Sequence, residues 1–135
     1  MSRTTLLDTP YVTLWFHEQT RVVHHVMHRF VPMKQMRELL LTGAEAMAAH
    51  GGCKWLSDDR KGTVVDAPRI EWARENWMPQ LKKAGFRYWA VVPSEAALGR
   101  WGMDRAIEDY VTAGVEVRSF PTSDDALAWL EARPG

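Results

Sequence analysis

Two runs near the start of the chain are rich in β-branched and aromatic residues and predict a β-hairpin. The runs are YVTLWF (residues 11–16) and RVVHHVMHRF (residues 21–30), and the polar segment HEQT separates them. A two-residue turn at residues 19–20 would fix the register between the two strands. The pairs that this turn predicts are Phe16 with Val23, Leu14 with His25, and Val12 with Met27.

The two faces of this hairpin differ in polarity, because side chains alternate along a strand. The face that carries the three predicted pairs is the more apolar one, so we expect it to meet the core. The opposite face mixes apolar, hydroxyl and imidazole side chains, namely Thr13, Trp15, His17, Val22, His24, Val26 and His28.

Helical and strand patterns alternate after the hairpin. Apolar residues recur at helical spacing from Met33, directly after Pro32, and this run ends at Gly51 and Gly52. Further helical patterns occupy residues 68–84, 94–112 and 122–133, and short strand patterns occupy residues 53–57, 87–93 and 115–120. Pro79 lies inside the second helical pattern and is expected to kink or split that helix.

The resulting order, β-β-α-β-α-β-α-β-α, predicts an α/β domain with a mostly parallel sheet and an antiparallel hairpin at one side. The strand at residues 87–93 is apolar on both faces, which is typical of a central parallel strand. The run at residues 115–120 alternates more cleanly and predicts an edge strand. We expect one domain over residues 1–135, with its core over about 10–132.

Composition limits the class of protein and its partners. The 135 residues suit one domain, and 46% hydrophobic and 25% charged residues exclude a disordered chain. Seventeen acidic residues balance seventeen basic ones, so nucleic acid is not an expected partner. The single cysteine, Cys53, excludes an internal disulfide and is expected to be a buried thiol. With no signal peptide and no run that could span a bilayer, we expect a cytoplasmic protein without membrane insertion.

Three local patterns, together with this order of elements, resemble the SpoIIAA-like group of the STAS superfamily. They are the opening hairpin followed by a helix, the segment W....WMPQLKKAGFRYWAVVP, and the ending VEVRSFPTSDDALAWL, and the resemblance covers about residues 10–132. It implies a sheet of about five strands with helices mainly on one face. It also implies a binding role in regulation or, because the superfamily is similar in layout to lipid-transfer domains, in holding apolar ligands.

The best understood members of this group are anti-sigma-factor antagonists, which are switched by phosphorylation of a serine at a helix N-terminus. Phosphate at that position meets the helix dipole and changes a docking surface. The matching segment here is DAPRI (residues 66–70), which keeps Asp66 but has Ala67 and Pro68 where the hydroxyl residues would be. The phosphorylation switch is therefore not expected in this chain.

The histidines of the hairpin suggest a metal site, but strand geometry argues against one. His24 and His28 share a face yet lie about 13 Å apart at 3.3 Å per residue, and only His17 can approach His24 diagonally. We therefore expect no metal. Trp15, His17, His24 and His28 are expected to contact a protein partner or a second copy in a homodimer. Such association would weaken below about pH 6, where imidazoles become charged.

The polar segment SDDRKG (residues 57–62) follows a parallel strand, where ligands of open α/β sheets usually bind. This segment and its surroundings could hold Mg²⁺ or contact a partner through Asp58, Asp59 and Asp66. The alternative interpretation is a solvated loop with no binding role.

Three tryptophans flank the same edge. Trp72, Trp77 and Trp101 could roof a pocket for a ligand or belong to the core.

Motifs of the common enzyme classes are missing from the sequence. It contains no P-loop, no dinucleotide fingerprint, no zinc-protease motif and no serine-hydrolase elbow, so neither enzyme activity nor a cofactor is expected. The sequence predicts a non-enzymatic, self-associating domain that acts through protein contacts in regulation. The alternative is a domain that binds a small apolar or lipid-like molecule.

Overall fold

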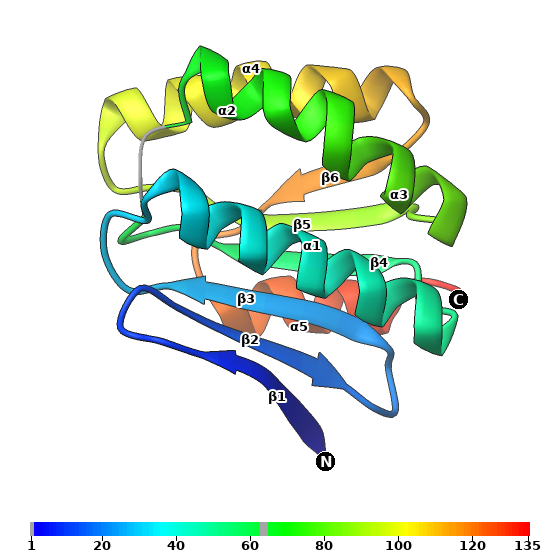
Figure 1. The fold of residues 1–135 in the computed structure, drawn as a ribbon. Helices are drawn as coiled ribbons and strands as arrows, with labels where there is room; N and C mark the ends of the chain where they lie inside the picture. Colours follow the sequence, from blue (N-terminus) through cyan, green and yellow to red (C-terminus); the bar gives the residue numbers. More distant parts are fainter. Residues whose placement is uncertain (1, 63–64) are drawn as a thin grey trace.

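Six strands form one mixed sheet in which spatial neighbours are also sequence neighbours (Figure 1). The computed structural model of the chain describes residues 2–62 and 65–135. The first three strands pair antiparallel, and the third to sixth run parallel because a helical segment separates each from the next. The strands are β1 (Arg3–Asp8), β2 (Val12–His17), β3 (Val22–Met27), β4 (Lys54–Asp58), β5 (Tyr88–Val92) and β6 (Glu116–Ser119).

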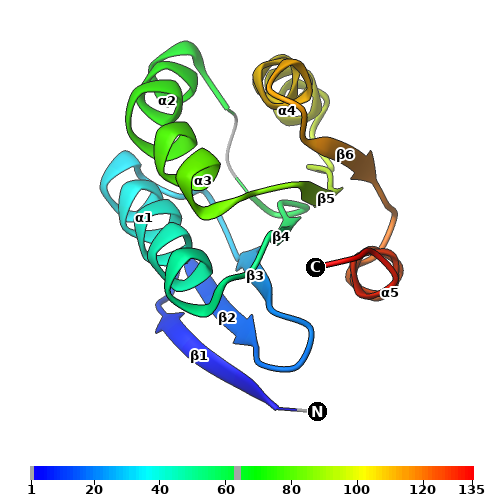
Figure 2. The ribbon, with the colours of Figure 1, turned by 90° about the vertical axis from the view of Figure 1, so that its right-hand side faces the viewer.

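Helices cover both faces of this sheet, most of them on one side (Figure 2). That side carries α1 (Met33–His50), α2 (Ala67–Trp72), the π-helical turn η1 (Ala73–Trp77), α3 (Met78–Ala84) and α4 (Ala97–Thr112), and the other side carries α5 (Ser123–Glu131). None of the helices in the described residues combines the length and the apolar character that crossing a membrane requires.

The hairpin of β2 and β3 has the predicted register. Phe16 lies opposite Val23, Leu14 opposite His25, and Val12 opposite Met27. The loop is longer than predicted, because pairing ends at His17 and Val22 and four residues connect the strands. Arg21 closes this loop with a positive φ of 59° and donates its backbone N–H to the His17 carbonyl at 2.7 Å. The predicted central strand is also confirmed, since β5 pairs parallel with β4 and β6.

The first strand, β1, was not predicted, so the expectation of about five strands is one strand short. β1 pairs antiparallel with β2 along the outer edge of the sheet, with an irregularity between Thr5 and Leu7. Only Leu6 and Leu7 of its six residues are half-buried. A short edge strand buries so little that its sequence, RTTLLD, has almost no apolar pattern to read.

Helix α5 is the exception to the expected arrangement with helices mainly on one face, because it packs on the opposite side of the sheet. Its apolar residues Ala126, Trp129 and Leu130 are buried against Val22, Leu56 and Tyr88, which project from the side opposite α1. Thr122 caps the start of this helix, since its hydroxyl accepts a hydrogen bond from the Asp125 backbone N–H at 3.2 Å. Helix α5 therefore covers the middle of that face of the sheet.

The second helical segment is interrupted as Pro79 predicts. A proline lacks the N–H that would bond one turn back, and its ring crowds the carbonyl four residues earlier. The helix widens here into the π-helical turn η1, in which the Met78 N–H donates a hydrogen bond to the Ala73 carbonyl five residues back. This turn sets Trp77 at 4% exposure against the sheet, between α2 and α3.

Gly43 lets α1 lie directly on the indole of Trp55. A Cβ built on Gly43 would overlap the Trp55 ring, and Trp55 is fully buried. The close approach of helix and strand therefore depends on the missing side chain.

The variant Gly43→Ala is expected to lower the free energy of unfolding by about 1–3 kcal/mol, because the new methyl group must displace Trp55 or the helix. This loss should appear although alanine favours a helix over glycine by about 1 kcal/mol. Urea unfolding at neutral pH measures it. Thr42→Ala, at the neighbouring half-buried position, is the control; a Gly43→Ala protein at least as stable as the wild type would contradict the packing argument.

Candidate functional site

A cavity of about 70 Å³ lies between the sheet and the helices α1, α2 and α4. Its wall is almost entirely carbon, and we call it the helix-side cavity. The aliphatic part of the wall consists of Met27, Met36, Leu40, Ile70, Met103 and Ala106. One water molecule needs about 10–15 Å³ by this kind of measure, so the space exceeds that of a single buried water. The cavity is close to the carboxyl ends of β3 and β4, the usual ligand edge of an α/β sheet.

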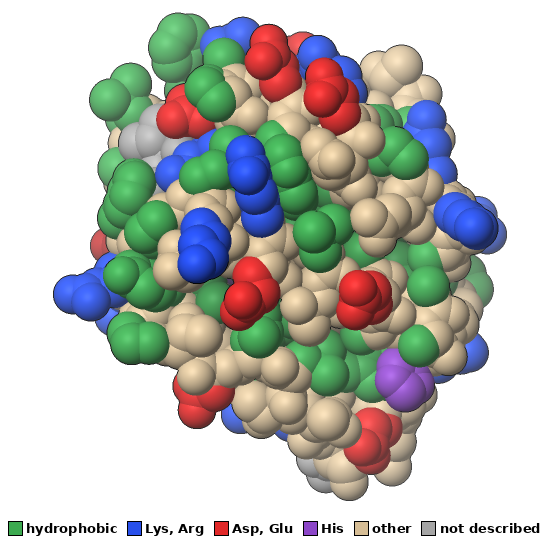
Figure 3. All heavy atoms as spheres, in the orientation of Figure 1, with side chains coloured by type: hydrophobic (Ala, Val, Ile, Leu, Met, Phe, Trp, Pro, Cys, Tyr) green, Lys and Arg blue, Asp and Glu red, His purple; other side chains and the backbone are tan. Residues whose placement is uncertain are grey.

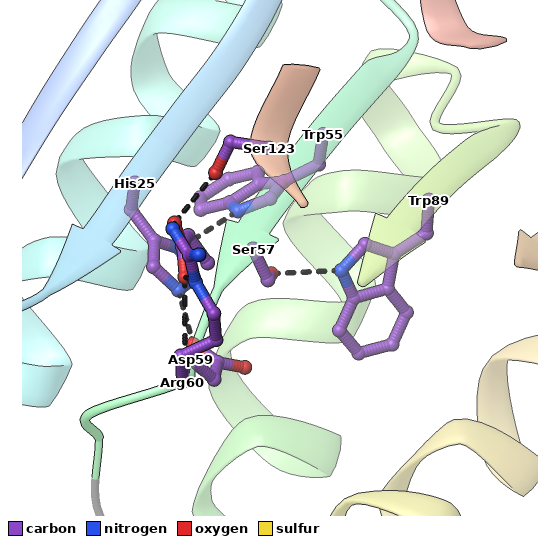
Figure 4. A network of polar contacts seen from close by, with 8 residues as sticks. His25, Trp55, Ser57, Asp59, Arg60, Trp89 and Ser123 are labelled. Atoms are coloured by element: carbon purple, nitrogen blue, oxygen red, sulfur yellow. Dashed lines mark hydrogen bonds and ion pairs between the residues drawn. The ribbon is translucent and has the colours of Figure 1, made fainter. Parts of the chain in front are cut away.

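A chain of buried hydrogen bonds links Trp55, His25 and Asp59 (Figure 4), and His25 and Asp59 line the helix-side cavity. The Trp55 indole N–H donates to His25 Nδ1 at 3.0 Å, and His25 Nε2 lies 2.7 Å from Asp59 Oδ1. Because an indole nitrogen can only donate, His25 Nδ1 must accept, and the imidazole proton is on Nε2. His25 is therefore neutral, donates to Asp59, and has no free nitrogen lone pair.

Asp59 is held firmly from three directions. Besides the bond from His25, its backbone N–H donates to the Val92 carbonyl at 2.9 Å and its carbonyl accepts from the Gly62 N–H at 3.0 Å. The residue is 4% exposed, yet its second carboxylate oxygen, Oδ2, has no hydrogen-bond partner among the described residues. Asp59 thus lines the helix-side cavity and is held in one orientation by the rest of the chain.

Two unpartnered donors belong to the same wall. Trp77 Nε1 and the Tyr110 hydroxyl are buried and lack a partner within residues 2–62 and 65–135, and both residues line the helix-side cavity. Their rings meet edge to face at a centroid distance of 5.6 Å. Burial, with a smaller contribution from the nearby Asp109 charge, raises the pKa of the Tyr110 phenol, so this group keeps its proton.

Trp89 differs from Trp77 because its indole N–H is satisfied. It donates to the Ser57 hydroxyl at 2.8 Å, as Figure 4 shows. Ser57 and Trp89 both line the helix-side cavity, but neither offers an unmet hydrogen bond there among the described atoms. The unmet polar groups of the wall are thus Asp59, Trp77 and Tyr110.

Arg69 adds a buried cation to this wall. Its guanidinium lies 3.6 Å from the Asp66 carboxylate and 5.5 Å from the centre of the Phe30 ring. The Arg69 side chain is 7% exposed, whereas Asp66 is 55% exposed. Asp66 also accepts the Arg69 backbone N–H at 3.1 Å and so caps α2.

The three aspartates that could have shared a ligand do not converge. Asp59 borders the helix-side cavity, whereas Asp58, one residue earlier, points to the α5 side and Asp66 caps α2. The described part of the chain contains no group of three or more His, Cys, Asp or Glu side chains placed to bind a metal ion. Strand alternation explains why Asp58 and Asp59 diverge, since consecutive residues face opposite sides of a sheet, and Asp66 lies outside the sheet at the start of α2.

Of the three tryptophans predicted to roof a pocket, the structure brings only Trp77 into the cavity wall. Trp72 is half-buried at the margin of the core, with the Arg37 guanidinium 5.6 Å from its ring centre. Trp101 is 64% exposed. It precedes Gly102, which packs so closely on the Val65 backbone that a Cβ would overlap it.

Sequence reasoning missed His25, Trp89, Arg69 and Tyr110 as residues of the site. The available signal was His25, an ionisable residue on the face of the hairpin that was predicted to meet the core. A buried histidine needs hydrogen-bond partners, and these led here to Asp59.

The sheet face that carries the other histidines is less open than predicted. His24 is 6% exposed, and its Nδ1 lies 3.0 Å from His17 Nε2, which confirms the predicted diagonal approach of these two residues. Trp15 is half-buried beneath the Arg3 guanidinium, 3.9 Å from its ring centre. His28 is exposed and forms a 2.8 Å hydrogen bond with the Thr13 hydroxyl.

The expectation that His24 becomes charged below about pH 6 is wrong. Burial, helped by the neighbouring His17 and His25, lowers the pKa of His24 from 6.5 to about 3. His24 therefore stays neutral in the folded protein at pH 5.5. Of the three histidines expected on the contact surface, His17, His24 and His28, only His28 is exposed.

Protein stability should fall between pH 6.5 and pH 3, because the unfolded chain binds a proton at His24 that the folded chain does not. Above pH 6.5 neither state binds this proton and the effect vanishes. From His24 alone, the free energy of unfolding is expected to be about 2 kcal/mol lower at pH 5 than at pH 7.5. Urea unfolding of wild type and His24→Leu at both values measures the difference.

The decrease in the free energy of unfolding from pH 7.5 to pH 5 should be about 2 kcal/mol smaller in His24→Leu than in the wild type. The control His28→Gln should show the wild-type decrease. An equal pH dependence in His24→Leu and wild type would contradict the assignment.

Asp58 fastens α5 to the end of β4. It accepts hydrogen bonds from Arg60 Nε at 3.0 Å, from Arg60 Nη2 at 2.8 Å, and from the Ser123 hydroxyl at 2.5 Å. Burial opposes its ionisation, but the hydrogen bonds from Arg60 and Ser123 outweigh burial and lower the pKa of Asp58. This carboxylate is therefore a structural anchor.

Asp58→Asn is expected to lower the free energy of unfolding at pH 7 by about 1–3 kcal/mol, because Arg60 and Ser123 lose a charged acceptor. The deficit should narrow as the pH falls through the lowered pKa of Asp58, where the wild type loses its charge too. Urea unfolding measures both effects. Asp104→Asn, at an exposed position of α4, should have little effect; equal stability of Asp58→Asn and wild type would refute the anchoring role.

Comparison of the chain with protein-family models, with curated proteins and with solved structures found no match.

Proposed function

We propose that this domain binds a small, largely apolar molecule in the helix-side cavity and performs no chemistry on it. The observation that carries the proposal is a cavity of about 70 Å³, beside the usual ligand edge of the sheet, whose accessible wall is almost entirely carbon. Such a wall favours an apolar guest.

A binding role is favoured over catalysis by the state of His25. Both of its ring nitrogens are engaged, one with Trp55 and one with Asp59, so the histidine closest to the cavity has no free site for accepting a proton. Its role in the proposal is to orient Asp59.

The protein-interaction role expected from the sequence has less support. Its contact surface was the sheet face with Trp15 and His24, where His24 is buried and α5 covers the adjoining strands. The regulatory role of STAS-like domains remains a resemblance only. The apolar-ligand alternative therefore becomes the proposal.

Xenon tests whether the helix-side cavity accepts an apolar guest, because the gas enters dry cavities lined by carbon. In ¹H–¹⁵N spectra, the indole signals of Trp77 and Trp89 should shift as xenon pressure rises, since both residues line the cavity. The signals of Trp129, on the α5 side, and of exposed Trp101 should move much less.

A filled cavity provides the matched control for xenon. Ala106→Phe places a ring in the cavity wall and should abolish the shifts of Trp77 and Trp89, whereas Ala128→Phe adds the same ring at an exposed position of α5. The proposal fails if no indole signal responds to xenon in the wild type, or if Ala106→Phe responds equally.

A further inference from the structure

The outer side of β1 is an open strand edge with a charged residue at each end. β1 is the first strand of the described sheet and pairs there with β2 alone. Its terminal residues, Arg3 and Asp8, are both exposed and carry opposite charges. The outward N–H and C=O groups of such an edge can pair with a strand of another chain. The backbone and the charges of β1 together specify which strand fits.

Two hydrogen bonds fix the direction of the backbone groups at the ends of β1. The Ser2 carbonyl accepts from the N–H of Glu18, just after β2, at 3.3 Å. The Thr9 N–H donates to the carbonyl of the first residue of β2 at 2.9 Å. Across a planar trans peptide bond, the C=O of one residue and the N–H of the next point in opposite directions. The N–H of Arg3 and the C=O of Asp8 therefore point away from β2, toward the open side.

The irregularity in β1 brings both charged side chains to one face of the sheet. Arg3 lies opposite His17 of β2, Asp8 lies opposite Thr13, and the register shifts between these two pairs. Residues directly opposite each other share a face, and so do His17 and Thr13, which are four positions apart. Arg3 and Asp8 are five positions apart, so only the extra residue of the bulge lets them share the face on the side of α5. The Arg3 guanidinium accordingly lies over Trp15 on that face.

A second copy of β1, running antiparallel, fits this edge in one register. Where Arg3 lies opposite Asp8 of the second copy, two-fold symmetry places Asp8 opposite Arg3 of that copy. Each outward N–H of Arg3 then meets an outward carbonyl of Asp8, and each guanidinium meets a carboxylate on the same face. Thr4 and Leu7 oppose each other in the same register, and both belong to the α1 side of the sheet.

We propose that two copies of this chain associate edge to edge through β1, with Arg3 of each copy paired with Asp8 of the other. The contact uses the strand edge and not the sheet face that the sequence predicted. A shifted register leaves both charges of each copy without a partner, so the charges also select the register. The interface is small, and we expect a Kd in the micromolar range. None of the described residues of β1 lines the helix-side cavity, so this proposal is independent of the proposed ligand.

Charge reversal tests the pairing by sedimentation equilibrium, at protein concentrations from the low micromolar to the millimolar range. The wild type should shift from the mass of one chain to that of two as its concentration rises. Arg3→Asp and Asp8→Arg should each raise the Kd at least about tenfold, because each variant places like charges opposite each other at both ends of the junction.

A mixture of the two variants should recover the association. One variant carries acidic residues at both positions and the other carries arginines at both, so an equimolar mixture again has opposite charges at each end. The mixture and the double variant Arg3→Asp/Asp8→Arg should both associate about as tightly as the wild type. Arg105→Asp and Asp104→Arg, at exposed positions of α4, are the matched controls and should leave the Kd of the wild type unchanged.

Thr5→Pro distinguishes strand pairing from a contact made by charged side chains alone. The N–H of Thr5 faces the open side, as does that of Arg3 two residues earlier. A proline at this position leaves the hydrogen bonds to β2 in place and blocks the approach of a second strand. The variant should remain monomeric throughout the concentration range, with a urea midpoint close to that of the wild type.

Three results would overturn the proposal. They are a wild type that stays monomeric over the whole range, a mixture that associates no better than either variant alone, and a Thr5→Pro protein that associates with the wild-type Kd. If Thr5→Pro does not fold, the mixture of the two charge variants decides alone, because both substitutions are at exposed positions.

Discussion

The buried contact between His25 and Asp59 is the interaction on which the candidate site depends. Its direction is set by Trp55, whose indole can donate a hydrogen bond but never accept one. The proton of the imidazole is thereby confined to the nitrogen that faces Asp59. The carboxylate of Asp59 is thereby held with one oxygen against His25 of β3.

Trp55 joins this interaction to the packing of the fold. The same indole that orders His25 lies beneath Gly43 of α1, so the distance between helix and sheet and the direction of the hydrogen bonds share one side chain. The wide turn η1 sets Trp77 edge to face against Trp55, with ring centres 5.1 Å apart. A change in how α1 packs on Trp55 would therefore move the side chains of His25 and Trp77 together.

Much of the fold could be predicted because it depends on local patterns. The hairpin register follows from alternation between two short strands, and the break at Pro79 follows from the missing N–H. The side of the sheet on which α5 packs could not be predicted, because amphipathicity shows that a helix has an apolar stripe and not which surface it will cover. The crossover rule gives no help here either, since no strand follows α5 in the described sheet.

The candidate site was harder to predict because it depends on single-residue differences. Asp58 and Asp59 are indistinguishable in the sequence, yet the last residue of β4 faces α5 and the next residue faces the helix-side cavity. Trp89 and Tyr110 read as core residues, and both are indeed in the core. The sequence does not show that Ser57 accepts the indole N–H of Trp89, whereas the hydroxyl of Tyr110 lacks a partner among the described residues.

Asp58 and Asp59 have different hydrogen-bond partners because consecutive residues at the end of β4 face opposite sides of the sheet. Asp58 accepts hydrogen bonds from the Arg60 guanidinium and from the Ser123 hydroxyl, so its carboxylate holds α5 to the end of β4. Asp59 meets only a neutral imidazole and is left with an unused acceptor. A fully satisfied carboxylate stabilises a fold, whereas a buried and half-satisfied one costs stability. Two adjacent and equally buried aspartates therefore contribute differently to the fold, because consecutive residues at the end of a strand meet different surroundings.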